Sequence, residues 1–383
     1  MRILYSAIDQ TVPGTKGGSV HVASVAEGLA ALGHDVHVLV GPGNGPFPSG
    51  PVKWIAMHPP FGAQQLRWAR RGAVKRLAGQ LRPDVIIERY YNFGGEAILH
   101  ARGLRARAVL EVNAPVVDHA GSIKAVIDAA LLVRPMQRWR ERLCAAADLI
   151  VTPDAAILPP GTAPAKILEA EWGADTERFH PGAKGPVPFT PPPGVVAVFA
   201  GAFRSWHGAI NLARAIRRLR ERGRHDVSAL FIGEGPALAA VKDEARNLEH
   251  VVFTGALPHT LMPAALAAAH IGVAPFDIGA HKPLALGFYW SPLKMFEYMA
   301  SGLPVVAPAV ARIPELVGQR REGVLYDPAD DTALASTLEE LAEDADLRAR
   351  LGTAARQRAL REYSWEAHCR SLDERITQLG PAR

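Results

Sequence analysis

The sequence predicts an α/β protein with two doubly wound, Rossmann-like domains. Short apolar runs alternate with stretches of helical periodicity along the whole chain, a pattern typical of parallel sheets covered on both faces. The chain has 383 residues, more than one hydrophobic core usually holds, which favours two domains. Between Phe179 and Gly194 the alternation stops in a segment rich in proline and glycine, which has the composition of an interdomain linker.

The first domain is expected to open with a strand at residues 2–8 and a Gly-rich loop that ends at Gly17-Gly18. Apolar residues then recur at spacings of three and four up to Leu32, which predicts a helix that ends at Gly33. The remaining strands of this domain are expected at 35–40, 52–57, 84–88, 108–112 and 149–152. Its remaining helices are expected at 64–81 and 122–147.

A second α/β pattern follows the linker. Its strands are expected at 195–200, 229–233, 251–254, 271–274, 304–307 and 323–326. Its helices are expected at 209–222, 236–248, 263–269, 292–301, 332–343 and 346–363, with a last amphipathic helix at 365–379. The predicted boundaries are a first domain at 1–178, the linker at 179–194, a second domain at 195–363 and a C-terminal helix at 364–383. Ligands of such sheets bind at the carboxyl ends of the strands.

Composition excludes several classes of protein. Apolar residues make up 48% and charged residues 21%, with a net charge of +5, so the chain is expected to fold. No apolar run approaches the ~18–20 residues of a membrane span, and no signal-peptide core precedes the first strand. The two cysteines, Cys144 and Cys369, lie in helical patterns, which argues against a disulfide framework and favours a reducing, cytoplasmic location. The mildly basic charge by itself indicates no nucleic-acid partner.

The strongest chemical signal lies in residues 288–307. Ser291 is a good N-cap, Pro292 suits the first position of a helix, and Gly302 is expected to end that helix. A helix N-terminus at the edge of a sheet presents free N–H groups and the positive end of a dipole. Such a terminus favours a phosphate ligand.

Two charged residues of this helix point to a nucleotide. Lys294 lies in the first turn, where a cation is unfavourable for the helix unless a bound anion compensates it. Glu297, three residues on, could accept hydrogen bonds from both hydroxyls of a ribose diol. The alternative is that Lys294 and Glu297 form an i,i+3 surface pair that stabilises the helix slightly.

With these motifs the chain resembles the retaining glycosyltransferases of family 4, which have the GT-B fold. The resemblance covers essentially the whole chain. Its motifs follow the family's order at Gly17–Val22, Gly33–Val36, Trp172–Asp175, Arg178–Pro181, Gly201–Gly208, Ile232–Pro236, Val252–Gly255 and Ser291–Pro304. It implies two domains facing across a cleft, with the C-terminal helix crossing back to the first. It also implies sugar transfer from a nucleotide donor, held by the second domain, to an acceptor held mainly by the first.

The resemblance also implies roles for individual residues. Arg204 and Lys294 are expected as the catalytic cations, and His21 and Asn113 on the acceptor side. The expected donor-binding residues are Gly17, Gly18, Arg204, His207, Gly233, Glu234, Leu257, Ser291, Pro292, Leu293, Lys294 and Glu297.

Three positions depart from the family's pattern. The family commonly has two glutamates eight positions apart, and here Tyr289 stands at the first position and Glu297 at the second. A Ser-Pro-x-Lys element beside them indicates a subgroup of the family. His207 stands where lysine is usual, and Asn113 stands where a histidine is often found. Since an amide cannot act as a general base, a mechanism that needs a base at Asn113 is not supported.

Two glycine loops carry alternative interpretations. Gly17-Gly18 leaves backbone N–H groups open to a diphosphate, or it is only a tight turn between strand and helix. Gly233-Glu234 is no dinucleotide fingerprint because the third glycine is missing; Glu234 either faces the nucleotide or is a solvated loop residue. The 14 histidines show no metal-ligand spacing, so neither a metal nor a cofactor is expected.

Basic residues gather in two helical stretches of the first domain. One interpretation is a peripheral membrane contact for a lipid-linked acceptor. The other is ordinary solvated helix faces. The residues are Arg67, Arg70, Arg71, Lys75, Arg76 and Arg82, then Arg134, Arg138, Arg140 and Arg142, with Trp68 and Trp139 among them.

The function indicated is a metal-independent, retaining glycosyltransferase that uses a nucleoside-diphosphate sugar, with a UDP-sugar favoured and a GDP-sugar next. Fixed cations and helix N-termini would stabilise the leaving group without a divalent ion. The acceptor is expected to be a small molecule or a glycan, and the oligomeric state has no signal in the sequence. Two alternatives stay open: a sugar-nucleotide 2-epimerase of the same fold, and a non-catalytic sugar-nucleotide-binding protein.

Overall fold

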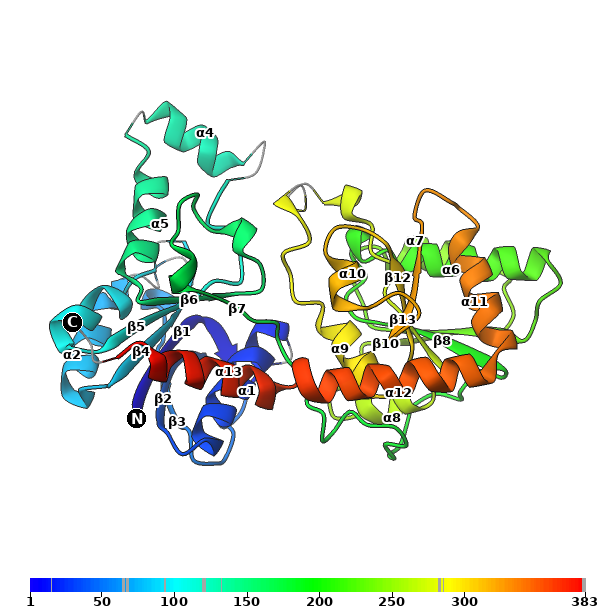
Figure 1. The fold of residues 1–383 in the computed structure, drawn as a ribbon, viewed down its shortest axis with the longest axis horizontal. Helices are drawn as coiled ribbons and strands as arrows, with labels where there is room; N and C mark the ends of the chain where they lie inside the picture. The colour runs from blue at the N-terminus through cyan, green and yellow to red at the C-terminus, as the bar shows by residue number, and fades with distance from the viewer. Residues whose placement is uncertain are drawn as a thin grey trace. The chain divides into compact units, whose positions relative to one another are not determined.

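The structure is a computed structural model of the chain. It describes residues 1–14, 16–63, 66, 69–92, 94–118, 122–131, 133–281, 284 and 286–380. The chain divides into two compact units, shown in Figure 1. The first unit comprises Met1–Trp172, Tyr289–Ser291 and Trp365–Arg383, and the second comprises Gly173–Phe288 and Pro292–Ser364.

The first unit is built on a seven-stranded parallel sheet of order β3-β2-β1-β4-β5-β6-β7. The order reverses between β1 and β4, and this switch point is where ligands of doubly wound sheets bind. The central strands are buried on both faces, as their unbroken apolar runs predict. The strands are β1 (Arg2–Val12), β2 (Asp35–Pro42), β3 (Lys53–Ala56), β4 (Val85–Arg89), β5 (Arg107–Glu111), β6 (Leu149–Thr152) and β7 (Ile167–Glu169).

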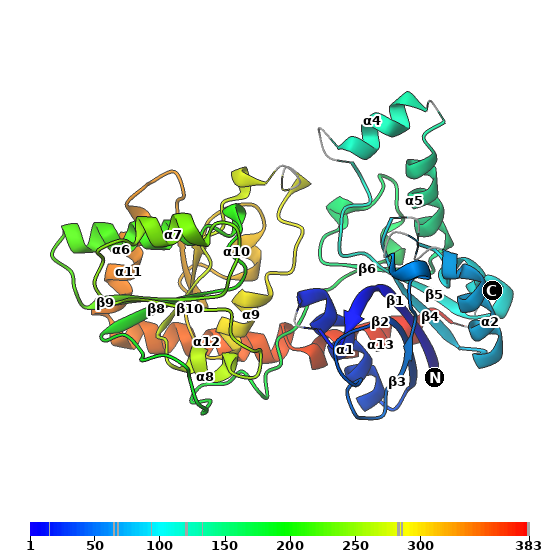
Figure 2. The same cartoon turned by 180° about the vertical axis from the view of Figure 1, so that it is seen from behind.

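Helices cover this sheet, and the last helix of the chain is one of them. Figures 1 and 2 show α13 beside α1, where Cys369 lies against Gly28. The helices of the first unit are α1 (Gly17–Ala31), α2 (Arg71–Leu81), α3 (Ala101–Leu104), α4 (Ile123–Ala130), α5 (Pro135–Ala146) and α13 (Trp365–Gln378). The cysteines Cys144 and Cys369 are buried and unbonded.

The second unit repeats the plan with a six-stranded parallel sheet of order β10-β9-β8-β11-β12-β13, which reverses between β8 and β11. Its core joins the sheet to α6, α11 and α12. The strands are β8 (Val195–Ala200), β9 (Val227–Ile232), β10 (Val251–Gly255), β11 (Ile271–Val273), β12 (Val305–Pro308) and β13 (Gly323–Tyr326). The helices are α6 (Ala209–Glu221), α7 (Leu238–Glu244), α8 (Met262–Ala267), α9 (Leu293–Ala300), α10 (Ile313–Leu316), α11 (Ala333–Glu343) and α12 (Ala345–Glu362).

Five details differ from the sequence prediction, and one of them is the four-residue helix α3, which was not predicted. The single helix expected at 122–147 is two helices, because Arg134 adopts a left-handed conformation and Pro135 opens α5. The helix expected at 64–81 begins at Arg71, and Gln64, Gln65, Arg67 and Trp68 lie outside the described residues. The short elements β7 and α10 were not predicted, since three or four residues carry too little periodicity.

The proline-rich segment has no regular secondary structure. Residues 179–194 contain no helix or strand. The compact units, however, meet along the chain at Trp172–Gly173, so this segment is grouped with the second unit. Within that unit Arg356 of α12 donates hydrogen bonds to the carbonyls of Thr176, Phe179 and Ala300.

Candidate active site

The switch point of the second sheet opens at Gly201, directly after β8. Gly201 has φ 135°, and a Cβ there would lie 3.1 Å from the ammonium nitrogen of Lys294. Gly233, after β9, has φ 130°, and a Cβ on it would collide with the Gly201 carbonyl. Both positions need glycine because two backbones and a lysine head group converge there.

Lys294 is the central group of this site. Its Nζ is buried and has no hydrogen-bond partner among the described residues. It lies 4.1 Å from the ring centroid of Phe199 and 5.4 Å from that of Phe276. Burial lowers its pKa to about 7, although the nearby Glu297 acts in the opposite direction. A buried amine held only by two aromatic faces lacks a counter-charge, which a bound anion would supply.

Arg204 and His207 lie in the loop between Gly201 and α6. Arg204 is exposed and directly precedes the short 3₁₀ turn Ser205–His207. The Nδ1 of His207 is paired with the Ala202 carbonyl. Burial, together with the charges of Lys294 and Arg204, lowers the pKa of His207 to about 3. His207 is therefore neutral in the ligand-free protein, at a position where the family usually has lysine, and its contact with the phosphates stays a prediction.

Glu297 follows Lys294 by one turn of α9 and is 9% exposed. Its Oε1 lies 3.3 Å from the Nε2 of His259, whose ring packs on Phe179. Leu257, half-buried, and Glu234, exposed, belong to the loops after β10 and β9. The Glu234 carboxylate lies near Gly255, 3.6 Å from the position of a Cβ there. Electrostatic contacts join Arg204, His207, Lys294 and Glu297 into one group, and the glycine loops border it.

Ser291 has a different role from the one predicted. The helix starts at Leu293, its N-cap is Pro292, and no side chain caps it. The Ser291 hydroxyl instead donates to Glu171 Oε2 at 2.6 Å and accepts from the Trp172 N–H at 2.9 Å. Thus Ser291 belongs to the first unit and the N-cap prediction is wrong. Lys294 consequently becomes the second residue of α9.

The Tyr289 position supplies no carboxylate. Its phenol is 3% exposed, it packs beside Trp290, and burial raises its pKa to about 12. The side chain is neutral and cannot replace the negative charge of the glutamate that is common at this position.

The switch point of the first sheet holds a second polar group, centred on Glu111 at the end of β5. Glu111 accepts hydrogen bonds from Tyr5 at 2.5 Å, from Arg89 at 2.8 Å and from Asn113. Arg89, which ends β4, also donates to Asp9 at 3.2 Å. We call these five residues the Glu111 cluster. Its charged groups are largely buried, and Arg89, the one cation among these five residues, is shared by the carboxylates of Glu111 and Asp9.

The two acceptor-side residues contact this cluster. His21 is 1% exposed, with its Nε2 2.8 Å from Glu111 Oε1 and its ring 4.5 Å from that of Trp172. Burial lowers the pKa of His21, and the neighbouring Glu111 carboxylate opposes this effect. Asn113 donates to Glu111 and accepts from the Trp172 indole at 2.9 Å. Both amide ends of Asn113 are thus occupied.

Gly17 and Gly18 are the first two residues of α1, whereas the sequence predicted that they end a loop. A Cβ on Gly18 would meet the end of the flexible Gln10 side chain, and one on Gly17 would lie 3.4 Å from Trp172. The N-cap residue, Lys16, makes no side-chain capping hydrogen bond. Contact of these glycines with a diphosphate therefore stays a prediction.

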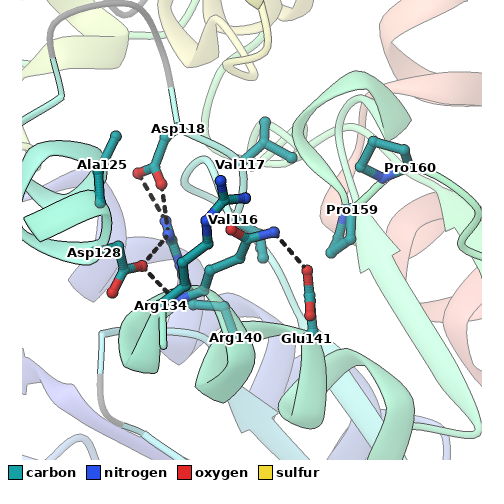
Figure 3. A pocket seen from close by; sticks show the side chains of 12 residues that line it. Val116, Val117, Asp118, Ala125, Asp128, Arg134, Arg140, Glu141, Pro159 and Pro160 are labelled. Carbon is teal, nitrogen blue, oxygen red and sulfur yellow. Dashed lines mark hydrogen bonds and ion pairs between the residues drawn. The ribbon is translucent and has the colours of Figure 1, made fainter. Parts of the chain in front are cut away.

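A cavity of about 320 Å³ lies elsewhere in the first unit, between α4, α5 and the loop at Pro159. Figure 3 shows Asp118 and Asp128 pointing toward Arg140, which is buried. Arg140 makes two hydrogen bonds to Asp118, at 2.9 and 2.6 Å. It therefore does not belong to an exposed basic face, and neither does the buried Arg70.

Comparison with known proteins identifies the family. Residues 15–158 match the family described as Glycosyltransferase Family 4, and residues 194–344 match the one described as Glycosyl transferases group 1. The chain belongs to the family 4 glycosyltransferases. Its two parallel-sheet units and its structural neighbours show that the fold is GT-B.

Curated relatives of this glycosyltransferase are distant. The chain is 29% identical over 218 residues to a GDP-mannose-dependent alpha-(1-6)-phosphatidylinositol monomannoside mannosyltransferase of Mycolicibacterium smegmatis, covering 55% of this chain and 56% of that enzyme. It is 26% identical over 403 residues to a glycogen synthase of Mycobacterium tuberculosis, covering 96% and 92%. The chain thus spans about half the length of the first relative and nearly all of the second.

Solved structures match the whole fold. A sucrose-phosphate synthase from Thermosynechococcus elongatus has a TM-score of 0.73 at 18% identity, covering 99% of this chain and 98% of that one. The Anabaena protein HepE, in complex with UDP-glucose, has a TM-score of 0.66 at 17% identity, covering 99% and 100%. At these identities the likeness establishes the fold alone.

Several residues of the two polar groups were not predicted from the sequence. Asp9, Arg89 and the role of Glu111 were not predicted, although charged residues that end buried strands are a usable signal. His259 lies in an irregular loop and gives no such signal. Among the described residues, no group of three or more His, Cys, Asp or Glu side chains is arranged to hold a metal ion. Asp344 and Asp346 lie at the start of α12, where the Asp344 side chain caps the helix.

Proposed function

We propose that the enzyme transfers a sugar from a nucleoside-diphosphate sugar to a hydroxyl acceptor, with retention of anomeric configuration and without a divalent metal. A UDP-sugar is the first candidate donor and a GDP-sugar the second. The acceptor is a small molecule or a glycan.

The observation that carries this proposal is the environment of Lys294. Its buried Nζ has no partner among the described residues and lies beside Gly201 at the switch point of the second sheet. The uncapped N-terminus of α9 begins one residue before it. A diphosphate would give this amine its counter-charge and would accept hydrogen bonds from the helix N–H groups. The exposed Arg204 would add a second fixed cation.

These cations act on the leaving group. As the bond between the sugar carbon and the diphosphate oxygen breaks, negative charge collects on that oxygen, and Lys294 and Arg204 stabilise it. The acceptor oxygen attacks the same face of the sugar, and its proton passes to the departing phosphate oxygen. Such a route needs no general base, which agrees with the absence of a free base at Asn113, whose amide is held by Glu111 and Trp172.

The named relatives differ in the nucleotide of their donor. HepE is described in complex with UDP-glucose, and the Mycolicibacterium smegmatis relative is described as GDP-mannose-dependent. The names of the relatives and neighbours mention a phosphatidylinositol monomannoside, glycogen and sucrose phosphate. These names therefore do not point to a single acceptor for this enzyme.

A binding screen followed by product analysis tests the proposal. Wild type and Lys294→Met are heated with UDP, GDP, ADP and their sugar conjugates. A ligand at 100 times its Kd should add about 2.7 kcal/mol of stability to the wild type only. The stabilising donor is then incubated with an acceptor panel, and NMR should show the donor's anomeric configuration in the product. Equal stabilisation of both proteins, or an inverted product, would contradict the proposal.

Metal independence has its own measurement. Turnover should be unchanged after treatment with EDTA, because the fixed cations already neutralise the diphosphate. A loss of turnover that Mg²⁺ or Mn²⁺ restores would overturn this part of the proposal while leaving the transfer itself intact.

A further inference from the structure

The α4 helix exposes an apolar face. Ile123 is 77% exposed, Val126 65% and Ile127 44%, and the turn that follows adds Leu131 at 53% and Val133 at 56%. Only three other large apolar side chains of the described residues are exposed, and they are scattered at Leu32, Phe61 and Leu360. We call residues 123, 126, 127, 131 and 133 the α4 patch. By their spacing, Ile123, Val126 and Ile127 share one face of the helix, and five exposed apolar side chains within eleven positions are typical of an interaction site.

The other face of α4 packs against α5, which keeps the apolar side chains of the patch exposed. Asp128, the single acidic residue of α4, is 3% exposed and accepts hydrogen bonds from the backbone N–H groups of Met136 and Gln137 at 2.9 and 2.7 Å. It thereby caps α5, the next helix. Ala125 and Asp128 line the cavity of Figure 3. With its acid turned inward, α4 presents no negative charge on the side of the patch.

Positive charge borders the patch. Arg134 directly follows Val133, and Arg138 and Arg142 follow at successive turns of α5; all three are exposed. The Trp139 indole lies between these turns and donates to the Gly94 carbonyl at 3.1 Å, with the guanidinium of Arg142 5.4 Å from its ring. An apolar helix face flanked by arginines and an amphipathic aromatic residue is the composition of helices that lie in a membrane interface.

We propose that the α4 patch binds the surface of an anionic lipid bilayer, with its apolar side chains in the interface and Arg134, Arg138 and Arg142 on the lipid phosphates. This inference goes beyond the proposed function, because it concerns a surface remote from the Lys294 group in sequence and it can be measured without donor or turnover. Within the described residues no helix is long and apolar enough to cross a bilayer. The contact is therefore superficial.

A second copy of the chain fits the patch less well. The eight residues of α4 extend only about 12 Å, whereas stable protein interfaces usually bury about 800 Å² per partner. Two copies meeting through this patch would also bring their three bordering arginines together without an acidic residue of α4 to compensate them. An anionic bilayer accommodates both, because the acyl boundary buries the apolar side chains and the lipid phosphates pair with the arginines.

Vesicle flotation tests the proposal with the full-length enzyme. Vesicles of phosphatidylcholine are compared with vesicles containing equal parts of phosphatidylcholine and phosphatidylglycerol, at low and high salt. The wild type should float with the anionic vesicles at least about tenfold more than with the neutral ones, and salt should weaken binding. The double variant Val126→Asp/Ile127→Asp should lose binding at least about tenfold.

Matched variants separate the patch from general effects. Leu360→Asp places the same charge at an apolar side chain of similar exposure, 48%, in the second unit and should bind as the wild type does. Arg138→Glu should weaken binding to anionic vesicles, whereas Arg246→Glu, at an exposed arginine of the second unit, should not. Circular dichroism checks that each variant is folded.

Three outcomes would overturn the proposal. The first is a wild type that binds neither kind of vesicle. The second is a folded Val126→Asp/Ile127→Asp variant that binds anionic vesicles as well as the wild type. The third is a lipid-free dimer in sedimentation velocity that the same variant dissociates, because the patch would then be an interface between copies. Donor binding by the variant, measured in the same preparation, shows whether the proposed function holds independently.

Discussion

The two sheets carry polar groups at equivalent places, but only the group of the first sheet hydrogen-bonds its central charge to a charge of opposite sign. At the switch point of the first sheet, Glu111 is bonded to Tyr5, Arg89 and Asn113. At the switch point of the second, Lys294 is buried against Phe199 and Phe276 with no hydrogen-bond partner among the described residues. The Glu111 carboxylate is thus hydrogen-bonded to other protein groups, whereas the Lys294 amine is available to an anionic ligand.

The pKa directions express the same contrast. Burial opposes ionisation of Glu111, yet His21, Arg89 and the Tyr5 hydrogen bond hold its pKa well below the ordinary value. Burial lowers the pKa of Lys294 to about 7 and is only partly opposed by Glu297. The comparison indicates that the first group stabilises the fold, whereas the second reduces stability until an anion binds.

The largest effect on stability is expected in the first group. Glu111→Ala leaves Arg89 buried without its main partner, and breaking a buried pair in this way costs about 3–5 kcal/mol. Because the pKa of Glu111 is lowered in the fold, its stabilisation is present above the unfolded carboxyl value of about 4.3 and is lost as the pH falls below it. Urea titrations of the wild type and Glu111→Ala at pH 7 and pH 4 measure both effects.

A double variant serves as the control for this pair. In Glu111→Gln/Arg89→Met the unpaired guanidinium is absent, although Asp9 loses its Arg89 partner, so stability should recover only part of the loss measured for the single variant Glu111→Gln. If the two single losses simply add, the two residues do not act as a pair and the comparison between the sheets fails.

The opposite behaviour is expected for Lys294. Lys294→Met removes a buried, unpartnered amine and keeps its volume, so the ligand-free variant should be no less stable than the wild type. Its kcat/KM should nevertheless fall by about 10²-fold, roughly 2.7 kcal/mol, because a fixed charge on the leaving group is lost. Urea titration and donor kinetics on the same preparation give both numbers. A variant with lower stability and wild-type kinetics would assign Lys294 to packing.

The fold could be read from the sequence because its signals are local. Alternating apolar runs and helical periods located every strand except β7, and the proline-rich segment marked the middle of the chain. Errors occurred where a conformation depended on one residue, as at the break between α4 and α5. The left-handed conformation of Arg134 has no signature in composition, although the following Pro135 could have indicated it.

The site was predictable only in part, because its partners are far apart in sequence. Lys294 and Glu297 were found from their spacing on one helix. Ser291 was misassigned because its hydroxyl bonds Glu171, which lies 120 residues away. The charge state of His207 depends on Lys294, 87 positions later, and on burial, neither of which a motif contains.

The pH dependence of nucleotide binding sharpens the comparison further. Above pH 7 the Lys294 amine of the free enzyme is increasingly neutral, and a bound diphosphate should restore its proton. Binding of UDP at pH 8 should therefore take up a large fraction of one proton, and its Kd should rise up to about tenfold per pH unit above 7. Calorimetry in buffers of different ionisation enthalpy measures the uptake, which Lys294→Met should abolish.

The sign for stability is opposite to that of a lysine whose pKa is raised by a salt bridge. The unfolded chain keeps the lysine proton up to about pH 10.4, whereas the ligand-free fold releases it near 7, so this group makes stability rise with pH between those values. Glu96, whose pKa burial raises to about 8, contributes in the other direction between about 4.3 and 8. The difference between wild type and Lys294→Met isolates the lysine, and a difference independent of pH would contradict the lowered pKa.

The smallest effect is expected at Glu297, which shares α9 with Lys294 but should contact a part of the donor that does not react. Its carboxylate is 9% exposed and lies 3.3 Å from His259 Nε2. If it holds a ribose diol, Glu297→Gln removes charge-assisted hydrogen bonds that are equal in the ground and transition states. The donor KM should then rise about tenfold with kcat nearly unchanged, and inhibition by the free nucleoside diphosphate should weaken in parallel. A fall in kcat at constant KM would place Glu297 beside the reacting sugar instead, and the two charges of α9 would then act at one centre rather than two.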